Sequence, residues 1–133
     1  MIDVPAGAKR ERIEEIVRFA HVIVVPVMPS AFDEMGTRSF LERLSELKPI
    51  RRGRRGIATI GNRIRPRTRA TARLDAFLSS LAFPAVARLR DSSHYAEASV
   101  SGITLFDMPK SKAGAALSDW DPLLLALRLH AAG

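Results

Sequence analysis

The sequence contains no cysteine, few aromatic residues and no long hydrophobic run. Without Cys among its 133 residues, the chain forms no disulfide and no thiolate metal site. Its longest apolar run, Val22–Met28, is too short to span a bilayer and is interrupted by Pro26. The first residues also lack the basic-then-apolar layout of a secretory signal. The sequence therefore predicts a cytoplasmic protein with no membrane partner.

Three kinds of catalytic or ligand-binding pattern are missing as well. The eight glycines are scattered, and the chain has no Gly-Lys-Thr or Gly-Lys-Ser of a phosphate-binding loop. His21, His94 and His130 share no spacing typical of metal ligands. Ser92, Ser93 and His94 are neighbours on one expected loop, an arrangement that does not make a nucleophile and its base. We expect these residues to serve as loop and helix-capping groups.

The residues that are present predict one globular domain spanning residues 1–133. Apolar residues make up 47% of the chain and charged residues 26%, values typical of a folded domain of this length. β-Branched or apolar runs predict strands, and apolar residues at helical spacing predict helices. The expected strands are Ile2–Val4, Val22–Val25, Ile57–Asn62 and Pro84–Leu89. The expected helices are Ala8–Ala20, residues 29–49, Thr68–Leu81, Ser93–Val100 and Lys112–His130.

Strands and helices alternate along the whole chain, with connections of a few residues. This order predicts an α/β fold, an open and mostly parallel sheet with flanking helices. The uninterrupted run Val22–Val25 is typical of a strand buried on both faces. We expect Pro26 to end that strand and Pro49 to end the helix that follows it.

The net charge of +7 is concentrated in one part of the sequence. Residues 51–90 hold eleven arginines and a single acid, Asp75, whereas the flanking parts are close to neutral. Guanidinium groups pair well with phosphate oxygens, and no aromatic side chain between residues 51 and 73 is available to stack on bases. The pattern favours sequence-independent, salt-sensitive binding to the DNA backbone; a solvated basic surface, or one facing an acidic partner, is the alternative. The candidate DNA-binding residues are Arg51, Arg52, Arg54, Arg55, Arg65, Arg67 and Arg69.

Four stretches of the chain form an ordered set of motifs. They are IDVPAG (residues 2–7), AHVIVVPVMPSAFDEMGT (20–37), GNRIRPRTR (61–69) and VARLRDSSHYAEASVSGITLFDMPKSKAG (86–114). Together they resemble the ParA/MinD family of partition and cell-positioning ATPases, a deviant branch of the P-loop nucleotide hydrolases. The resemblance implies an incomplete P-loop NTPase domain that corresponds to the C-terminal part of such an ATPase, without its Walker A strand and loop.

The resemblance also implies roles for individual residues. Asp3 would order a water on Mg²⁺, and the Gly7 amide would approach the terminal phosphate of ATP, once a phosphate loop is supplied. Asn62 would face the adenine, with Asp91 nearby. The chain departs from the family pattern at Val4, where a Thr is usual, and at His21, where an Asp is usual. Read without the family, Asp3 is a strand-end carboxylate that caps the following helix, and Asn62 turns the chain and bonds to its own loop.

The family's missing strand has a consequence for the sheet. In that family it lies between the Asp-bearing strand and the strand equivalent to Val22–Val25. Here the two neighbours either close up or leave an unpaired edge through which the chain self-associates.

Three functions are consistent with this sequence. The chain is a ParA-like protein, related to ATPases of plasmid or chromosome partitioning, that does not hydrolyse ATP by itself and works with a partition partner protein. Alternatively, it is a non-catalytic DNA-binding module located on the nucleoid, or a vestigial truncated product.

Overall fold

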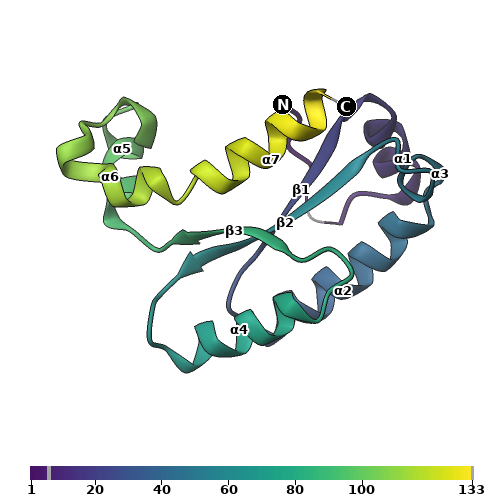
Figure 1. Ribbon diagram of the computed structural model, residues 1–133, viewed down its shortest axis with the longest axis horizontal. Helices are drawn as coiled ribbons and strands as arrows, with labels where there is room; N and C mark the ends of the chain where they lie inside the picture. The colour runs from purple at the N-terminus through teal and green to yellow at the C-terminus, as the bar shows by residue number, and fades with distance from the viewer. Residues whose placement is uncertain (6, 133) are drawn as a thin grey trace.

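Three parallel β-strands form the centre of the computed structural model, which describes residues 1–5 and 7–132 (Figure 1). The strands are β1 (Val22–Val27), β2 (Gly56–Ile64) and β3 (Ala85–Arg90), in the spatial order β1-β2-β3. Thr59 of β2 lies opposite Val25 on one side and Ala85 on the other. The predicted α/β fold with an open parallel sheet is therefore confirmed, with three strands in the described residues instead of four.

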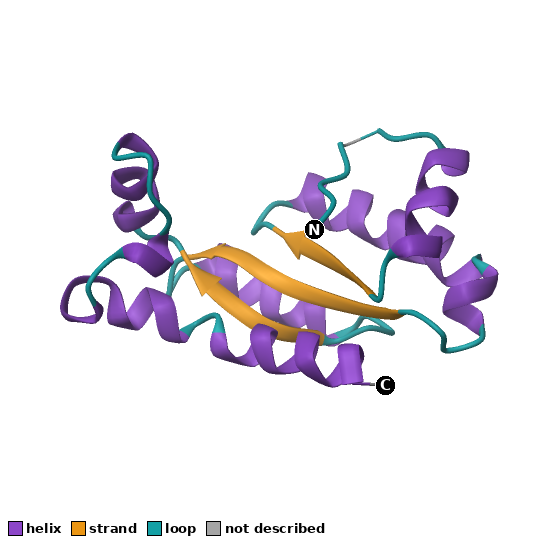
Figure 2. Ribbon diagram, turned by 90° about the horizontal axis from the view of Figure 1, so that it is seen from above, coloured by secondary structure: helices purple, strands orange, loops and turns teal. Residues whose placement is uncertain are grey.

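Helices cover both faces of this sheet. Figure 1 shows α7 on one face and α2 with α4 on the other, and Figure 2 shows the strands between these two layers. None of the helices in the described part of the chain is long and apolar enough to cross a membrane. The helices are α1 (Arg10–Phe19), α2 (Ala31–Glu46), α3 (Lys48–Arg51), α4 (Arg69–Ser79), α5 (Ser93–Val100), the 3-10 helix η1 (Leu105–Asp107), α6 (Lys110–Ser118) and α7 (Asp121–Ala132).

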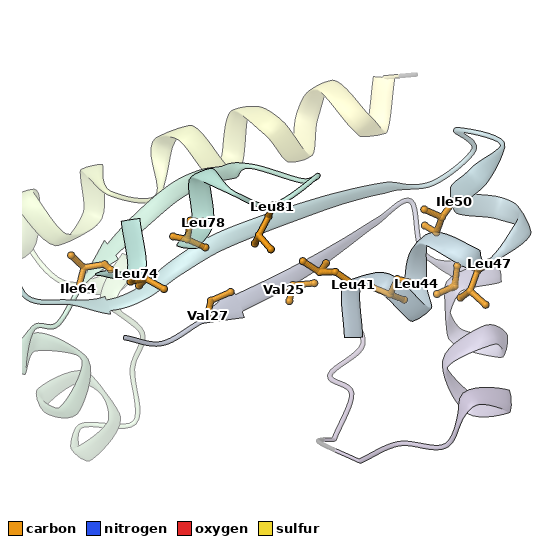
Figure 3. Packing of buried hydrophobic residues seen from close by; sticks show 11 residues of the cluster. Val25, Val27, Leu41, Leu44, Leu47, Ile50, Ile64, Leu74, Leu78 and Leu81 are labelled. Carbon is orange, nitrogen blue, oxygen red and sulfur yellow. The ribbon is translucent and has the colours of Figure 1, made fainter. Parts of the chain in front are cut away.

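The main hydrophobic core lies between the sheet and the pair α2 and α4 (Figure 3). Leu41 and Leu44 are three residues apart on α2, and Leu74 and Leu78 are four apart on α4, so each pair lies on one face of its helix. Val27 of β1 is fully buried against this layer. The apolar side chains whose spacing predicts these helices are thus the ones that fill the core.

A second core lies under α7. Leu123 packs against Ala58 and Ile60 of β2 and the apolar residues of β3. Trp120 contacts this core and also a smaller cluster built by α5, η1 and α6, and its indole N–H donates to the Tyr95 hydroxyl at 3.0 Å. Trp120 therefore contacts both the sheet core and the cluster of α5, η1 and α6.

Hydroxyl side chains start three of the helices, and capping was expected for one of them, Ser92. Ser30 accepts from the Asp33 amide, Thr68 from the Thr71 amide and Ser92 from the His94 amide. These bonds satisfy amides that have no partner within the first helical turn. They place the beginnings of α2, α4 and α5 directly after the carboxyl ends of the strands.

The prediction of a strand at Ile2–Val4 is wrong. These residues form no strand, and Ile2 and Val4 are 57% and 37% exposed. A three-residue apolar segment buries too little surface to be held in place unless a neighbouring strand pairs with it, and the described pairings of β1 involve β2 alone. The outer edge of β1 is consequently open in the described residues, and self-association through it stays a prediction.

Pro26 and Pro49 do not have the effects that we expected. β1 continues through Pro26 to Val27, because an edge strand tolerates a residue without an N–H. Val24 and Pro26 are also exposed, so β1 is not buried on both faces. Pro49 does not stop a helix either: α2 has already ended at Glu46, and Pro49 lies in the first turn of α3, where a missing N–H has no partner to lose.

The single C-terminal helix expected at Lys112–His130 is in fact two helices. α6 ends at Ser118 and α7 begins at Asp121. Asp119 at the break accepts from both the backbone and the side chain of Arg90, and Pro122 occupies the first turn of α7. A long-range ion pair, which sequence spacing does not reveal, sets this boundary.

Candidate functional site

The structure does not bring the seven candidate DNA-binding arginines together. Arg51, Arg52, Arg54 and Arg55 precede β2, whereas Arg65, Arg67 and Arg69 follow it. β2 has nine residues, and at about 3.3 Å per residue the two groups lie on the order of 26 Å apart. The arginine-rich sequence thus supplies two separate surfaces, one at each end of the sheet.

The group at the amino end of β2 borders a cleft of about 370 Å³. The cleft lies where α1, the end of α2 and α3 meet, and these elements gather at the end of the molecule opposite α5 and α6 (Figure 1). We call it the basic cleft. Its cationic residues are Arg10, Arg18, Lys48, Arg52 and Arg54, and its acidic residues are Glu14 and Glu46.

Apolar packing fixes the walls of the basic cleft. Val17 of α1 is 2% exposed and belongs to the same core as Leu44 and Leu47 of the α2–α3 junction. Val17 and Leu47 also line the cleft itself. The charged side chains are therefore mounted on helices that the main core holds in place.

Most of the positive charge in the basic cleft is unpaired. Arg10 is paired, since its Nε donates to Glu14 at 2.9 Å, and this hydrogen bond raises the pKa of Arg10. Within the described residues, no hydrogen bond or ion pair is made by the side chains of the other four cations. These are Arg18, Lys48, Arg52 and Arg54. Unpaired guanidinium and ammonium groups around a concavity are the chemistry that binds phosphate or carboxylate oxygens.

Arg55 is engaged differently from its neighbours. Its guanidinium donates to the carbonyl oxygens of Arg18 at 3.0 Å and of Val17 at 3.4 Å, at the end of α1. A positive charge at the C-terminal end of a helix interacts favourably with the helix dipole. The hydrogen bonds also satisfy carbonyl groups that have no partner within the helix. Arg55 therefore holds α1 against the amino end of β2.

The contrast between Arg55 and Arg54 gives a testable prediction. We expect Arg55→Gln to lower the free energy of unfolding by about 1–2 kcal/mol, because it removes charge-assisted hydrogen bonds. Arg54→Gln serves as the control and should change that energy by less than about 0.5 kcal/mol, since its side chain is exposed. Urea denaturation measures both variants. Equal stability of the two would show that the Arg55 contacts hold nothing in place.

Asn62 and Asp91 do lie at one edge of the sheet. Asn62 is near the carboxyl end of β2, and Asp91 directly follows β3, its amide donating to the Ile64 carbonyl at 2.9 Å. Asn62 Oδ1 accepts from the Arg63 amide at 3.0 Å, and Asp91 Oδ2 accepts from Arg65 Nε at 2.7 Å. Both side chains thus form hydrogen bonds with residues at this edge of the sheet. For Asn62 this agrees with the alternative interpretation, in which it turns the chain and bonds to its own loop.

Asp3 and Gly7 lie in the exposed segment before α1. Gly7 has φ +83°, and a Cβ added there would meet no atom within 4 Å, so no close backbone approach requires a glycine. Asp3 is exposed, and α1 has Lys9 as its N-cap and no side-chain capping bond, so Asp3 does not cap that helix. The predicted capping role of Asp3 is wrong.

The described residues do not fit ATP and Mg²⁺ in this arrangement. The Asp91 carboxylate is already paired with Arg65, and Asp3 stands on an exposed segment and not on a strand end. Across residues 1–5 and 7–132, no group of three or more His, Asp or Glu side chains could hold a metal ion. We therefore derive no catalytic step through a bound nucleotide.

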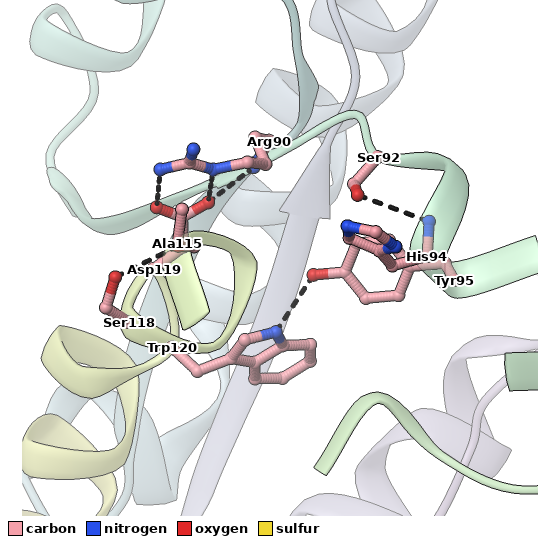
Figure 4. A network of polar contacts seen from close by, with 8 residues as sticks. All are labelled: Arg90, Ser92, His94, Tyr95, Ala115, Ser118, Asp119 and Trp120. Atoms are coloured by element: carbon pink, nitrogen blue, oxygen red, sulfur yellow. Dashed lines mark hydrogen bonds and ion pairs between the residues drawn. The ribbon is translucent and has the colours of Figure 1, made fainter. Parts of the chain in front are cut away.

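The carboxyl end of β3 is tied to the C-terminal helices by an ion pair. Arg90 Nε and Nη2 donate to the two carboxylate oxygens of Asp119 at 2.6 and 2.8 Å (Figure 4). The Arg90 amide donates to the same carboxylate at 3.1 Å. The guanidinium hydrogen bond, helped by the amide, holds the pKa of Asp119 below its ordinary value.

This lowered pKa predicts a dependence of stability on pH. A carboxylate with a depressed pKa stabilises the fold above its unfolded-state value, near 4, and that contribution is lost as the pH falls through the folded-state value. Asp119→Asn keeps the shape but removes the charge. We expect it to lower the unfolding free energy by about 1 kcal/mol at pH 7, because the pair is partly exposed. Denaturation experiments should show that the difference in unfolding free energy between the wild-type chain and Asp119→Asn is smaller in acid than at pH 7. A difference that does not change with pH would exclude the charge as its cause.

Sequence reasoning missed the contribution of α1 and of Lys48 to the basic cleft. Arg10, Glu14 and Arg18 are four residues apart, a spacing that places them on one helix face, but nothing in the sequence says what that face lies against. Lys48 was missed because the sequence predicted one continuous helical segment ending at Pro49, whereas α2 ends before Lys48.

No protein-family model and no curated protein matches this chain.

Proposed function

We propose that this chain is a ParA-like protein, related to the ATPases of plasmid and chromosome partitioning, and that its own activity is binding to the DNA backbone. The ordered resemblance of four stretches supports the family relation. The open parallel sheet is compatible with it, because Asn62 and Asp91 follow neighbouring strands at the carboxyl edge, where ligands bind in such sheets. In this proposal hydrolysis needs a phosphate loop that the 133 residues do not contain, and a partition partner acts with the chain on the nucleoid.

The observation that carries DNA binding is the surplus of unpaired cations at the amino end of β2. Arg51, Arg52 and Arg54 are exposed, and their side chains have no hydrogen-bonding partner in the described part of the chain. At the other end of the sheet Arg65 is paired with Asp91, and Arg63, Arg67 and Arg69 are exposed without a partner in the described residues. The amino end differs because the unpaired Arg18 and Lys48 of the basic cleft add to its exposed arginines. Contacts to phosphates from such groups carry no sequence information.

Salt dependence tests this proposal. Fluorescence anisotropy with two labelled duplexes of unrelated sequence should give similar affinities, and the logarithm of the binding constant should fall linearly with the logarithm of the salt concentration. Strong preference for one duplex would overturn the sequence-independent mode. Failure to bind either duplex at low salt would overturn DNA binding.

The family relation is tested separately by the intact mass of the protein made in its native cells. A product heavier than 14.6 kDa that carries a Gly-Lys-Thr or Gly-Lys-Ser loop ahead of Asp3 would support the relation to partition ATPases. A heavier product without such a loop would contradict it. A product of 14.6 kDa would restrict the function to binding without hydrolysis.

A further inference from the structure

The interior of the basic cleft differs from the exposed arginine surface beside it. A volume of about 370 Å³ is within the range of small-molecule sites, roughly 300–1,000 Å³. Arg52 and Arg54 are exposed and accessible to a large convex partner such as a DNA duplex. Arg18 of α1 and Lys48 of α3 line the same cleft, so one small ligand bound in it can contact both.

Helical spacing lines up the charged side chains along the walls of the basic cleft. Arg10, Glu14 and Arg18 are four residues apart on α1, so they form one stripe along the helix. Lys48 of α3 and Arg52, which follows α3, are also four apart, and the Arg52 amide donates to the Lys48 carbonyl at 3.1 Å, so their side chains lie on the same side of this turn. Arg18, which has no partner in the described residues, thus lines one concavity together with Lys48 and Arg52, while Arg10 is paired with Glu14.

We propose that the basic cleft binds a small molecule carrying several linked phosphate groups. Four unpaired cations line the cleft, and a chain of three phosphates brings a comparable number of negative charges. A single phosphate, with a charge of about −1.5 to −2, pairs with only part of them. The unpaired cations come from α1, α3 and the turn after α3, so several linked anionic groups can contact more of them than a single anion can. Glu14 is neutralised by Arg10, so Glu46 is the one acid that such a ligand meets without a counter-ion.

This ligand would regulate the DNA contact, and here the inference rests on the proposed function. Arg52 and Arg54 belong both to the cleft and to the exposed surface that we assign to DNA. A polyphosphate held between α1 and α3 occupies their guanidinium groups. DNA and the small anion therefore compete for the same two arginines.

Isothermal titration calorimetry with inorganic tripolyphosphate tests the site. We expect one ligand per chain, with tighter binding than for inorganic phosphate. The double variant Arg18→Gln/Lys48→Gln should weaken tripolyphosphate binding at least about tenfold, because it removes one unpaired cation from α1 and one from α3. The control Arg67→Gln/Arg69→Gln makes the same charge change at the far end of β2 and should leave the affinity within about twofold. Circular dichroism checks that each variant folds.

The outcomes separate this inference from the proposed function. Several weak tripolyphosphate sites per chain, or equal losses in the two double variants, would mean binding by net charge and would overturn the site. If DNA binds as proposed but tripolyphosphate does not displace it, the competition is wrong and DNA binding stands. If tripolyphosphate binds at one site but no duplex binds, the cleft stands and the proposed function fails.

Discussion

Replacing Arg51, Arg52 and Arg54 together with glutamine is expected to weaken binding to duplex DNA by about a hundredfold or more at 0.1 M salt. Each lost phosphate contact removes about 0.9 from the slope of the salt dependence, so three contacts remove nearly three. At 0.1 M salt a slope difference of that size corresponds to between two and three powers of ten in affinity. Anisotropy titrations of the wild-type chain and the variant over several salt concentrations measure both quantities.

The matched control is a triple variant at the other end of β2, Arg63→Gln/Arg67→Gln/Arg69→Gln. It changes the net charge by the same amount, and all three side chains are exposed. Arg63 and Arg67 have positive φ angles of 53° and 64°, and glutamine meets the same backbone strain there. A much smaller loss in this control would locate the DNA contact at the amino end of β2. A loss as large as that of the first variant would show that binding follows total charge and that neither end is a site.

Local sequence patterns were sufficient to predict the fold class but not the residues at which every helix and strand begins and ends. Helix α5 begins and ends at the predicted residues, because Ser92 caps it and no distant contact competes. The break between α6 and α7 was missed because Asp119 is held by Arg90, 29 residues earlier in the chain. The strand at Ile2–Val4 was predicted from apolar residues alone, whereas a strand also needs a partner. Long-range pairing decided these two elements.

The sequence predicts which kind of residue forms the candidate site, but not which of these residues lie together in the fold. The sequence shows that arginines are abundant after residue 50, but the length of β2 separates them into two surfaces. The same limit applies to α1, whose Arg10 and Arg18 line the basic cleft because Val17 anchors α1 in the core that also contains Leu47. Arg55 is equivalent to its neighbours in sequence, and its bonds to the carbonyls of α1 distinguish it. Tertiary contacts assign these roles to residues of the same type.

Leu44→Ala should be among the most destabilising single substitutions in the chain. Leu44 is 1% exposed and lies in the main core with Leu41 and Leu47 of the α2–α3 region (Figure 3). Truncating a buried leucine removes its burial and leaves a cavity, which together cost about 2–5 kcal/mol. A domain of this size has a total stability of about 5–15 kcal/mol, so the loss is a large fraction of it. Urea denaturation or calorimetry measures the change.

Leu125→Ala is the matched control, because the same atoms are removed from a helix position that is 59% exposed. It should change the unfolding free energy by less than about 0.5 kcal/mol. Leu44 also supports the α2 wall of the basic cleft, so the folded fraction of Leu44→Ala should bind tripolyphosphate more weakly than Leu125→Ala does. If Leu44→Ala lost stability but kept full affinity, the cleft would be independent of the main core. Equal stability of the two variants would mean that α2 does not pack on the sheet as described.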